Sequence, residues 1–277
     1  MKSGSLIFLL VVSNFLVFSS FLGERPSGPS VYFFDVGQGD SALIRANGMD
    51  ILVDAGPGKN VLYGLERALP KMDKYIDLVV VSHPHADHYG GLGHILSGYE
   101  VGAVAWNGSG SSEELSAIIG KAEEKGIPVI RFFAGSSIRS EGLNIEIVYP
   151  PRGTEEKILA GNDGSLVLFA ELGEMGGLFA GDIARKAEPL VSAVKFPKLD
   201  FLKIPHHGSD SSSSYALISA ANPSVAVLSV GKNSYGLPDG AVLERFSSFG
   251  IPVFRTDKEK GIKIGNDGGE LIIKSLE

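Results

Sequence analysis

Short apolar segments separated by turn residues dominate the chain from residue 31 onward. The first three predict strands at 31–35, 41–45 and 49–54, because each is apolar-rich and bounded by glycine or aspartate. Asn47-Gly48 lies between the last two and is a strong hairpin-turn signal. The folded part is therefore expected to open with a β-meander and not with a βαβ unit.

Helical patterns alternate with further strands along the rest of the chain. Ser111 to Glu114 forms a capping-box pattern for a helix that Gly126 ends. The residues GIPVIR at 126–131 and GIPVFR at 250–255 form two matching helix-to-strand joins, which hint at an architecture of two halves. Strands in two runs with interspersed helices predict an αββα sandwich of two mixed sheets. Strands are expected at 77–81, 101–106, 127–132, 143–149, 165–170, 177–180, 201–204, 225–230 and 250–255, and helices at 63–69, after 88, after 112, at 211–220 and at 241–249.

Composition narrows the class of protein. The chain has 277 residues, and its 44% hydrophobic and 21% charged residues are typical of a globular protein. A net charge of −7 provides no broad basic surface for nucleic acid. The absence of cysteine excludes disulfides, thiolate ligands and a cysteine nucleophile. Any metal site must therefore use histidine, aspartate, asparagine or water.

The N-terminal residues are nearly all apolar from 6 to 22. This stretch fits an uncleaved membrane anchor, or alternatively the core of a secretory signal peptide. Lys2 before it favours an internal amino terminus and a domain outside the membrane. We therefore predict a signal or anchor with its linker at 1–29 and one folded domain at 30–277. Because the linker is short, the functional edge of the domain is expected near the membrane.

The densest set of metal-ligating residue types directly follows the strand at 77–81. His83, His85, Asp87 and His88 lie within six residues. Two histidines spaced two apart can both reach one ion from an extended loop, while Asp87 and His88 point to a second position nearby. Zinc favours nitrogen ligands with a few carboxylates, and catalytic sites keep one position open. Because clustered ionisable groups cost stability without a role, a metal centre is favoured over simple packing.

Other predicted strands also end in metal-ligating residues. Asp54 follows one strand, Asp182 follows another, and His206-His207 follow a third. Loops that meet at one edge of a sandwich can assemble a site from distant sequence. Five of the six histidines lie in two strand-end motifs, and the sixth, His94, is interpreted as structural on a helix face.

These residues resemble those of the metallo-β-lactamase superfamily, through Asp54, the HxHxDH motif at 83–88, Asp182 and His206. The segments FDVGQGDS at 34–41, NDGSLVL at 162–168 and PHHGS at 205–209 resemble its ComEC-like branch, in which the domain is often fused to a DNA-uptake channel. The resemblance covers about residues 31–265. It implies the αββα fold of that superfamily.

The resemblance also implies a centre for two divalent metal ions, zinc or alternatively manganese. The first two histidines of the cluster would bind one ion, the Asp–His pair that ends the cluster would bind the other, and Asp182 would bridge both. His206 is preferred to His207 for the last position, because it is the first residue past Pro205, so His207 would face the substrate. The expected metal ligands are His83, His85, Asp87, His88, Asp182 and His206, and the expected catalytic residues are Asp87, Asp182 and His207.

Two positions depart from the family pattern. The superfamily usually places a third histidine between the cluster and the bridging aspartate, but no histidine lies between His94 and His206. Asn162, Asp163 or water would stand in for it. The branch often has a histidine after a Tyr-Gly pair near the carboxyl end, where this chain has Leu237.

Further residues have expected supporting roles. Asp54 would accept a hydrogen bond from a ligating imidazole and so orient the cluster. Ser209, Ser211, Lys203 and Lys232 lie near the last motif and would be placed to bind substrate oxygens. The alternative for Ser209 is a helix cap, and simple solvation is the favoured alternative for the two lysines.

The resemblance implies a metal-dependent hydrolase outside the membrane, a phosphodiesterase or nuclease acting on DNA or another phosphodiester. A hydroxide held between the two ions would be the nucleophile. Two alternatives stay open. One is a non-catalytic metal-binding module that assists a membrane DNA-uptake channel or another partner, and the other is a hydrolase of lactams or thioesters.

Overall fold

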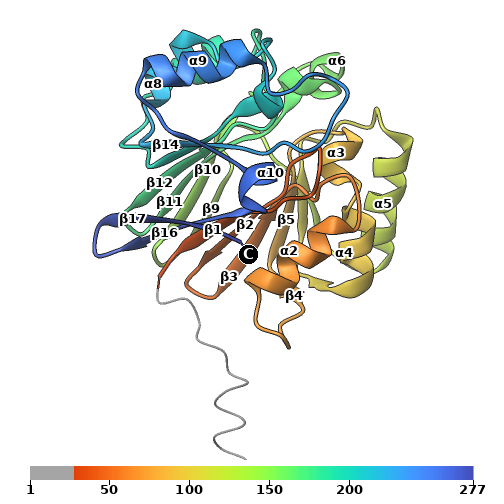
Figure 1. The fold of residues 1–277 in the computed structure, drawn as a ribbon. Helices are drawn as coiled ribbons and strands as arrows, with labels where there is room; N and C mark the ends of the chain where they lie inside the picture. Colours follow the sequence, from red (N-terminus) through yellow and green to blue (C-terminus); the bar gives the residue numbers. More distant parts are fainter. Residues whose placement is uncertain (1–27, 277) are drawn as a thin grey trace, which may run out of the picture.

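Two β-sheets packed face to face form the centre of the protein (Figure 1). The computed structural model describes residues 28–276, so the predicted anchor lies outside the described residues. The first sheet has eight strands and the second has seven. In spatial order, the first contains β17 (Glu270–Ser275), β16 (Ile262–Asp267), β1 (Ser30–Phe33), β2 (Ala42–Ala46), β3 (Met49–Val53), β5 (Leu78–Val81), β7 (Val104–Trp106) and β8 (Val129–Arg131); the second contains β15 (Val253–Arg255), β14 (Val225–Leu228), β13 (Phe201–Lys203), β12 (Met175–Phe179), β11 (Val167–Leu172), β10 (Leu143–Tyr149) and β9 (Ser137–Ser140).

Helices cover the outer face of each sheet, which confirms the predicted αββα sandwich (Figure 1). One apolar cluster joins the helices near the amino terminus to the first sheet, and another joins the later helices to the second sheet. The first group is α2 (Asn60–Ala68), α3 (Ala86–Tyr89), α4 (Leu92–Gly98) and α5 (Glu113–Glu124), the second is α7 (Glu188–Ser192), α8 (Tyr215–Ala221) and α9 (Gly240–Ser248), and the short elements β4 (Tyr75–Ile76), β6 (Glu100–Val101), α6 (Glu156–Leu159), η1 (Asn162–Gly164), η2 (Pro205–Gly208) and α10 (Thr256–Glu259) complete the chain.

The packing of each strand explains whether its sequence is continuously apolar or alternates between apolar and polar residues. β5 consists of Leu-Val-Val-Val and is buried at all four positions, since the facing sheet covers one side and helices cover the other. β10, in the second sheet, instead alternates between buried and more exposed positions. Leu143, Ile145 and Ile147 face the first sheet, and the residues between them are polar. Continuous apolar runs therefore mark strands between two layers, and alternation marks a strand with one open face.

Strand direction brings the predicted site residues to one edge of the sandwich. β3, β5 and β7 are mutually parallel neighbours in the first sheet, as are β12, β13, β14 and β15 in the second. The carboxyl ends of parallel strands lie at the same edge of a sheet, and the loops that follow them collect there. The two repeated joins end at β8 and β15, each a parallel edge strand of its sheet, so the matching sequences occupy equivalent places in the two sheets.

Within residues 28–276, no helix has the length and apolar character that a membrane crossing requires.

Candidate metal centre

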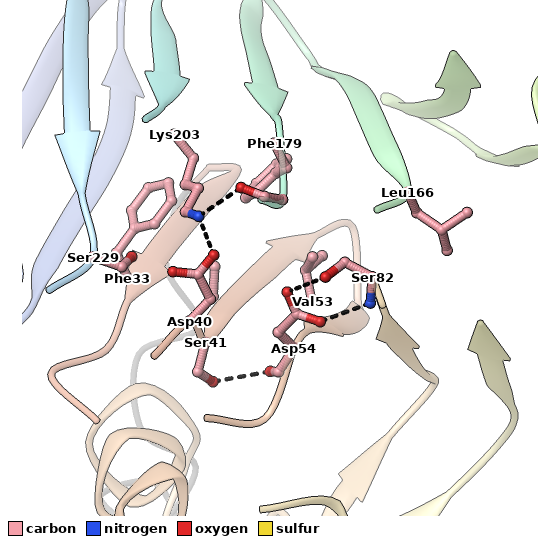
Figure 2. Close-up of a pocket in the computed structure, with 12 residues that line it drawn as sticks. Phe33, Asp40, Ser41, Val53, Asp54, Ser82, Leu166, Phe179, Lys203 and Ser229 are labelled. Atoms are coloured by element: carbon pink, nitrogen blue, oxygen red, sulfur yellow. Dashed lines mark hydrogen bonds and ion pairs between the residues drawn. The ribbon is translucent and has the colours of Figure 1, made fainter. Parts of the chain in front are cut away.

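Asp54 lies behind the histidine cluster and fixes one of its rings. It directly follows β3, and its φ of +60° turns its carboxylate toward the end of β5. One carboxylate oxygen accepts a hydrogen bond from the Ser82 backbone N–H at 2.7 Å, and the other lies 2.8 Å from His88 Nδ1. Figure 2 shows Asp54 and Ser82 joined in this way. His88 therefore presents Nε2 to the centre, which is the role expected for Asp54.

Four side chains from three loops meet at the centre. Asp182 Oδ2 lies 3.2 Å from His88 Nε2 and 3.5 Å from His207 Nε2, and Asp87 Oδ2 lies 3.1 Å from His207 Nε2. One ligand atom from each of these four residues lies within 4.8 Å of all the others. Two imidazole nitrogens and two carboxylate oxygens at such distances can surround one divalent cation.

His83 lies next to both His88 and His85, and it also approaches the Asp182 carboxylate. His83 Nε2 is 4.0 Å from Asp182 Oδ2, and the His83 ring is 4.2 Å from the His88 ring and 4.5 Å from the His85 ring. His83 is fully buried, whereas His85 is partly exposed. Asp182 Oδ2 is thus within 4.0 Å of the Nε2 atoms of His83, His88 and His207.

The two adjacent histidines of η2 point in different directions. Both have a φ of +51°, so the chain turns sharply after Pro205. His207 is buried and joins Asp87 and Asp182 at the centre, while its Nδ1 lies 3.0 Å from the Ser229 carbonyl oxygen. His206 Nε2 instead lies 2.8 Å from Asn162 Nδ2. This geometry favours His207 over the expected His206 as a metal ligand, because the left-handed turn directs the second histidine toward Asp87 and Asp182.

Asn162, one of the residues expected to stand in for the missing third histidine, lies beside His206. Asn162 Nδ2 is 2.8 Å from His206 Nε2, and His206 Nδ1 is 3.1 Å from Ser211 Oγ. Asn162 Oδ1 is buried and makes no hydrogen bond to residues 28–276. Asn162 therefore lies next to His206, the histidine that the sequence analysis preferred as a metal ligand.

Asp163 and Ser209 hold loops and do not reach the centre. Asp163 Oδ1 accepts hydrogen bonds from the backbone N–H groups of Ala184 and Ala187 at 2.9 and 3.2 Å, and so holds the loop after Asp182. Ser209 Oγ lies 2.9 Å from Ser211 Oγ within a turn. The cap of α8 is Ser214, so the expected capping role of Ser209 is wrong.

The carboxylates of the centre favour positive charge at the imidazoles. Burial lowers the pKa of His207, but the charges of Asp182 and Asp40 outweigh it and raise the pKa to about 10. Burial likewise lowers the pKa of His88, and Asp182 and Asp54 raise it well above its usual value. His83 differs, because burial holds its pKa well below the usual value. The negative charge that favours protonation of His88 and His207 would equally favour a bound metal cation at the centre.

Buried atoms without hydrogen-bond partners show that these residues fit a metal ion. Within residues 28–276, His83 Nε2, His88 Nε2 and Asp182 Oδ1 are buried and have no hydrogen-bond partner. Leaving such atoms unsatisfied costs stability. Both imidazole nitrogens lie within 4.0 Å of Asp182 Oδ2, and a divalent ion held by these residues would accept their lone pairs. The donor set of imidazole nitrogen and carboxylate oxygen suits divalent metal ions.

Sequence reasoning missed two buried residues of the centre, Asp40 and Lys203. Figure 2 shows their side chains paired at a pocket between the two sheets, near Asp54. Lys203 is 3% exposed, so the expectation that it is solvated is wrong; Lys232 is exposed as expected. The sequence does contain a feature that marks each of these two residues. Asp40 ends the GQGD turn, and Lys203 is a charged residue in a fully buried strand directly before the last motif.

The turn before Asp40 packs tightly against the backbone of Asp87. Asp40 N donates a hydrogen bond to the Asp87 carbonyl oxygen at 3.1 Å. A Cβ at Gly39 would lie 2.3 Å from that same oxygen, and the φ of Gly39 is +147°. Only glycine fits there, so the turn sets the position of the backbone that carries Asp87.

Gly39→Ala should destabilise the metal-free protein by about 3 kcal/mol or more, through the clash and the backbone strain. It should also weaken metal binding, because Asp87 must move. Gly37→Ala is the matched control: its φ is +86°, but a Cβ there meets no atom within 4 Å. We expect this control to cost only about 1–2 kcal/mol. Urea unfolding of the metal-free proteins measures the loss of stability in each variant. Equal losses in Gly39→Ala and Gly37→Ala would contradict the proposed packing.

The fold and the site define the class of protein. The family model of the metallo-β-lactamase superfamily matches residues 34–232. The chain belongs to this superfamily, and it is a metal-dependent hydrolase by fold and candidate site. YhfI of Bacillus subtilis, a metallo-β-lactamase fold protein, superposes with a TM-score of 0.57 over 89% of this chain and 100% of its own, at 13% identity, which shows the fold alone.

Sequence relatives place the chain in the ComEC-like branch. ComE operon protein 3 of Bacillus subtilis (strain 168) is 29% identical over 257 residues, which cover 84% of this chain and 32% of that protein. Competence protein ComA of Neisseria gonorrhoeae is 28% identical over 261 residues, 90% of this chain and 35% of that protein. The chain spans about a third of the length of these relatives.

Proposed function

We propose that this protein is a metal-dependent phosphodiesterase that cleaves DNA or another phosphodiester. The observation that carries the proposal is the convergence of three imidazole Nε2 atoms, those of His83, His88 and His207, on one oxygen of Asp182. The likeness to a protein named competence protein ComA supports a substrate related to DNA.

Each residue of the centre has a defined part in this proposal. His83 and His85 would hold one divalent ion, Asp87, His88 and His207 would hold a second, and Asp182 would contact both. Metal ions at such centres activate water at neutral pH and stabilise charge on phosphoryl oxygens. Asp54 keeps the Nε2 of His88 free for this purpose by accepting a hydrogen bond from Nδ1.

His206 and Ser211 are placed to bind the substrate. His206 is only partly buried, and its pKa is lowered from the usual value chiefly by burial. It is therefore a neutral imidazole at neutral pH, with hydrogen-bonding atoms near Asn162 and Ser211. These groups can donate hydrogen bonds to phosphoryl oxygens at the rim. In this proposal the substrate-facing role expected for His207 passes to His206.

We also propose that residues 1–29 anchor the domain to a membrane, with the domain outside, or direct its secretion. The uncharged stretch at 6–22 supports this. The full-length protein should fractionate with membranes, resist extraction by high salt, and be accessible to protease added to spheroplasts. Recovery of the intact chain in the soluble cytoplasmic fraction would refute it.

The activity is tested with purified protein loaded with zinc or manganese, with the metal content measured by mass spectrometry. Single-stranded and double-stranded DNA should be cleaved, while a chromogenic lactam and a thioester should not. Lack of cleavage of both DNA and a small chromogenic phosphodiester by the fully loaded protein, with either metal, would refute the proposal. Cleavage of the lactam or thioester instead would favour that class of hydrolase.

Asn162 favours a second candidate, a non-catalytic metal-binding module that assists a channel or another partner. An amide is a weaker metal ligand than the usual imidazole, so one position of the centre is weakened. Metal content separates the candidates. One tightly held ion and no hydrolysis favour the module, whereas two ions with DNA cleavage favour the enzyme.

A further inference from the structure

The two carboxylate oxygens of Asp182 face different groups. Oδ2 faces the imidazole nitrogens of the centre, with His88 Nε2 nearest at 3.2 Å. Oδ1 is the Asp182 oxygen nearer to Lys203 Nζ, at 3.6 Å. Within residues 28–276 Oδ1 has no hydrogen-bond partner, so the ammonium charge is what compensates it. Oδ2 thus lies closest to the imidazole ligands, and Oδ1 lies closest to the Lys203 ammonium.

Lys203 is enclosed by acceptors that all belong to the site. Its ammonium forms an ion pair with Asp40 Oδ2 and donates a hydrogen bond to the Gly181 carbonyl oxygen at 3.0 Å. Gly181 directly precedes Asp182, so Lys203 holds both the backbone and the carboxylate of that residue. An ammonium has three N–H donors, and three oxygens surround this one. Burial lowers the pKa of Lys203, but Asp40 and Asp182 outweigh it and raise the pKa, so the group stays charged.

Asp40 extends the contact to the other ligands. Its Oδ1 lies 3.3 Å from His207 Nδ1, and its Oδ2 lies 3.8 Å from His88 Nδ1. Asp40 comes from the loop after β1 in the first sheet, whereas Lys203 ends β13 in the second (Figure 2). The ion pair therefore joins the two sheets directly behind the ligand residues that each sheet supplies.

Stability alone is a poor reason for such a pair. Desolvating an ammonium and a carboxylate costs several kcal/mol per ion, and apolar replacements of both partners are often neutral or stabilising. A pair in this position instead fixes the geometry of the groups around it.

We propose that Lys203 is a positioning residue of the metal centre. It reserves Oδ1 of Asp182, so that Asp182 binds metal through Oδ2 alone, and through Asp40 it fixes the spacing between the ligands of the two sheets. This inference rests on the proposed metal centre and is independent of the substrate.

The test compares three variants of the full-length protein. Lys203→Met removes the ammonium and keeps most of the side-chain volume. Asp40→Asn with Lys203→Met removes both charges, which proteins tolerate better than the loss of one partner. Lys198→Met is the control, since Lys198 also pairs with an aspartate, Asp200, beside the same strand but is exposed. Metal affinity is measured by competition with a chromophoric chelator, coordination by the visible spectrum of the cobalt-loaded protein, and stability by thermal unfolding without metal.

We expect Lys203→Met to bind metal about 10–100-fold more weakly. Its cobalt spectrum should lose intensity, because Asp182 then chelates through both oxygens and the coordination number rises. The double variant should regain the thermal stability of the wild type without metal, yet keep the weak affinity and the altered spectrum. Lys198→Met should match the wild type in affinity and spectrum.

Two outcomes would overturn the inference. One is an unchanged affinity and cobalt spectrum in Lys203→Met. The other is a double variant in which stability, affinity and spectrum recover together, since the pair would then act only in folding; this outcome decides the matter even if Lys203→Met alone does not fold. Neither outcome depends on hydrolysis, so a protein that cleaves no phosphodiester can still confirm or overturn the role of Lys203.

Discussion

Asp182→Asn should remove at least one divalent ion and abolish hydrolysis. Asp182 Oδ2 is the atom on which His83, His88 and His207 converge. An amide is neutral and cannot supply negative charge to two cations, so we expect metal affinity to fall by more than about 100-fold, beyond the usual effect of losing an outer partner. Dialysis followed by elemental analysis measures the loss.

Asp200→Asn is the matched control for this change. Asp200 is also a buried aspartate of the second sheet, but it accepts a hydrogen bond from Gly176 N at 2.9 Å and pairs with Lys198, away from the centre. We expect it to reduce stability while metal content stays normal. Unchanged metal content in Asp182→Asn would show that Asp182 does not bridge the ions.

His207→Ala should reduce metal binding far more than His206→Ala. His207 Nε2 lies 3.1 Å from Asp87 Oδ2 and 3.5 Å from Asp182 Oδ2, whereas His206 Nε2 contacts Asn162. We expect a loss of affinity of roughly 100-fold or more for His207→Ala, since a ligand matters at least as much as its outer partners. His206→Ala should keep its metal and lose turnover on phosphodiester substrates.

The two histidine variants serve as controls for each other, since they remove the same side chain at adjacent positions. Metal stoichiometry and the rate of DNA cleavage are measured on both. The opposite order of metal loss would restore the assignment that the sequence favours, with His206 as the ligand.

Much of the centre can be predicted from sequence because it lies where apolar strands end. Asp54, the cluster at 83–88 and Asp182 each follow a buried strand, and parallel strands bring those ends together. The choice between His206 and His207 could not be predicted in this way. It depends on left-handed backbone at both residues, and no side-chain pattern encodes that turn.

Other features depend on contacts between residues far apart in sequence. The pairing of Asp40 with Lys203 joins loops of different sheets, so neither residue shows its partner in the sequence. β16 and β17 form a hairpin that extends the first sheet beside β1, but β17 is half-exposed and lacks a clear alternation. Their place in the fold is set by pairing with β1, which composition alone does not indicate.

The direction of β1 determines how the domain is presented to its surroundings. β1 starts at Ser30, pairs with β2 on one side and β16 on the other, and runs toward the loop that carries Asp40. Because β1 runs antiparallel to β2 and β2 runs antiparallel to β3, β1 starts at the end of the sandwich opposite the edge where Asp54 follows β3 (Figure 1). If residues 1–29 tether the chain as proposed, the attachment would be at the end of the sandwich opposite the ligand residues. The candidate site would then face away from the attachment surface and not toward it.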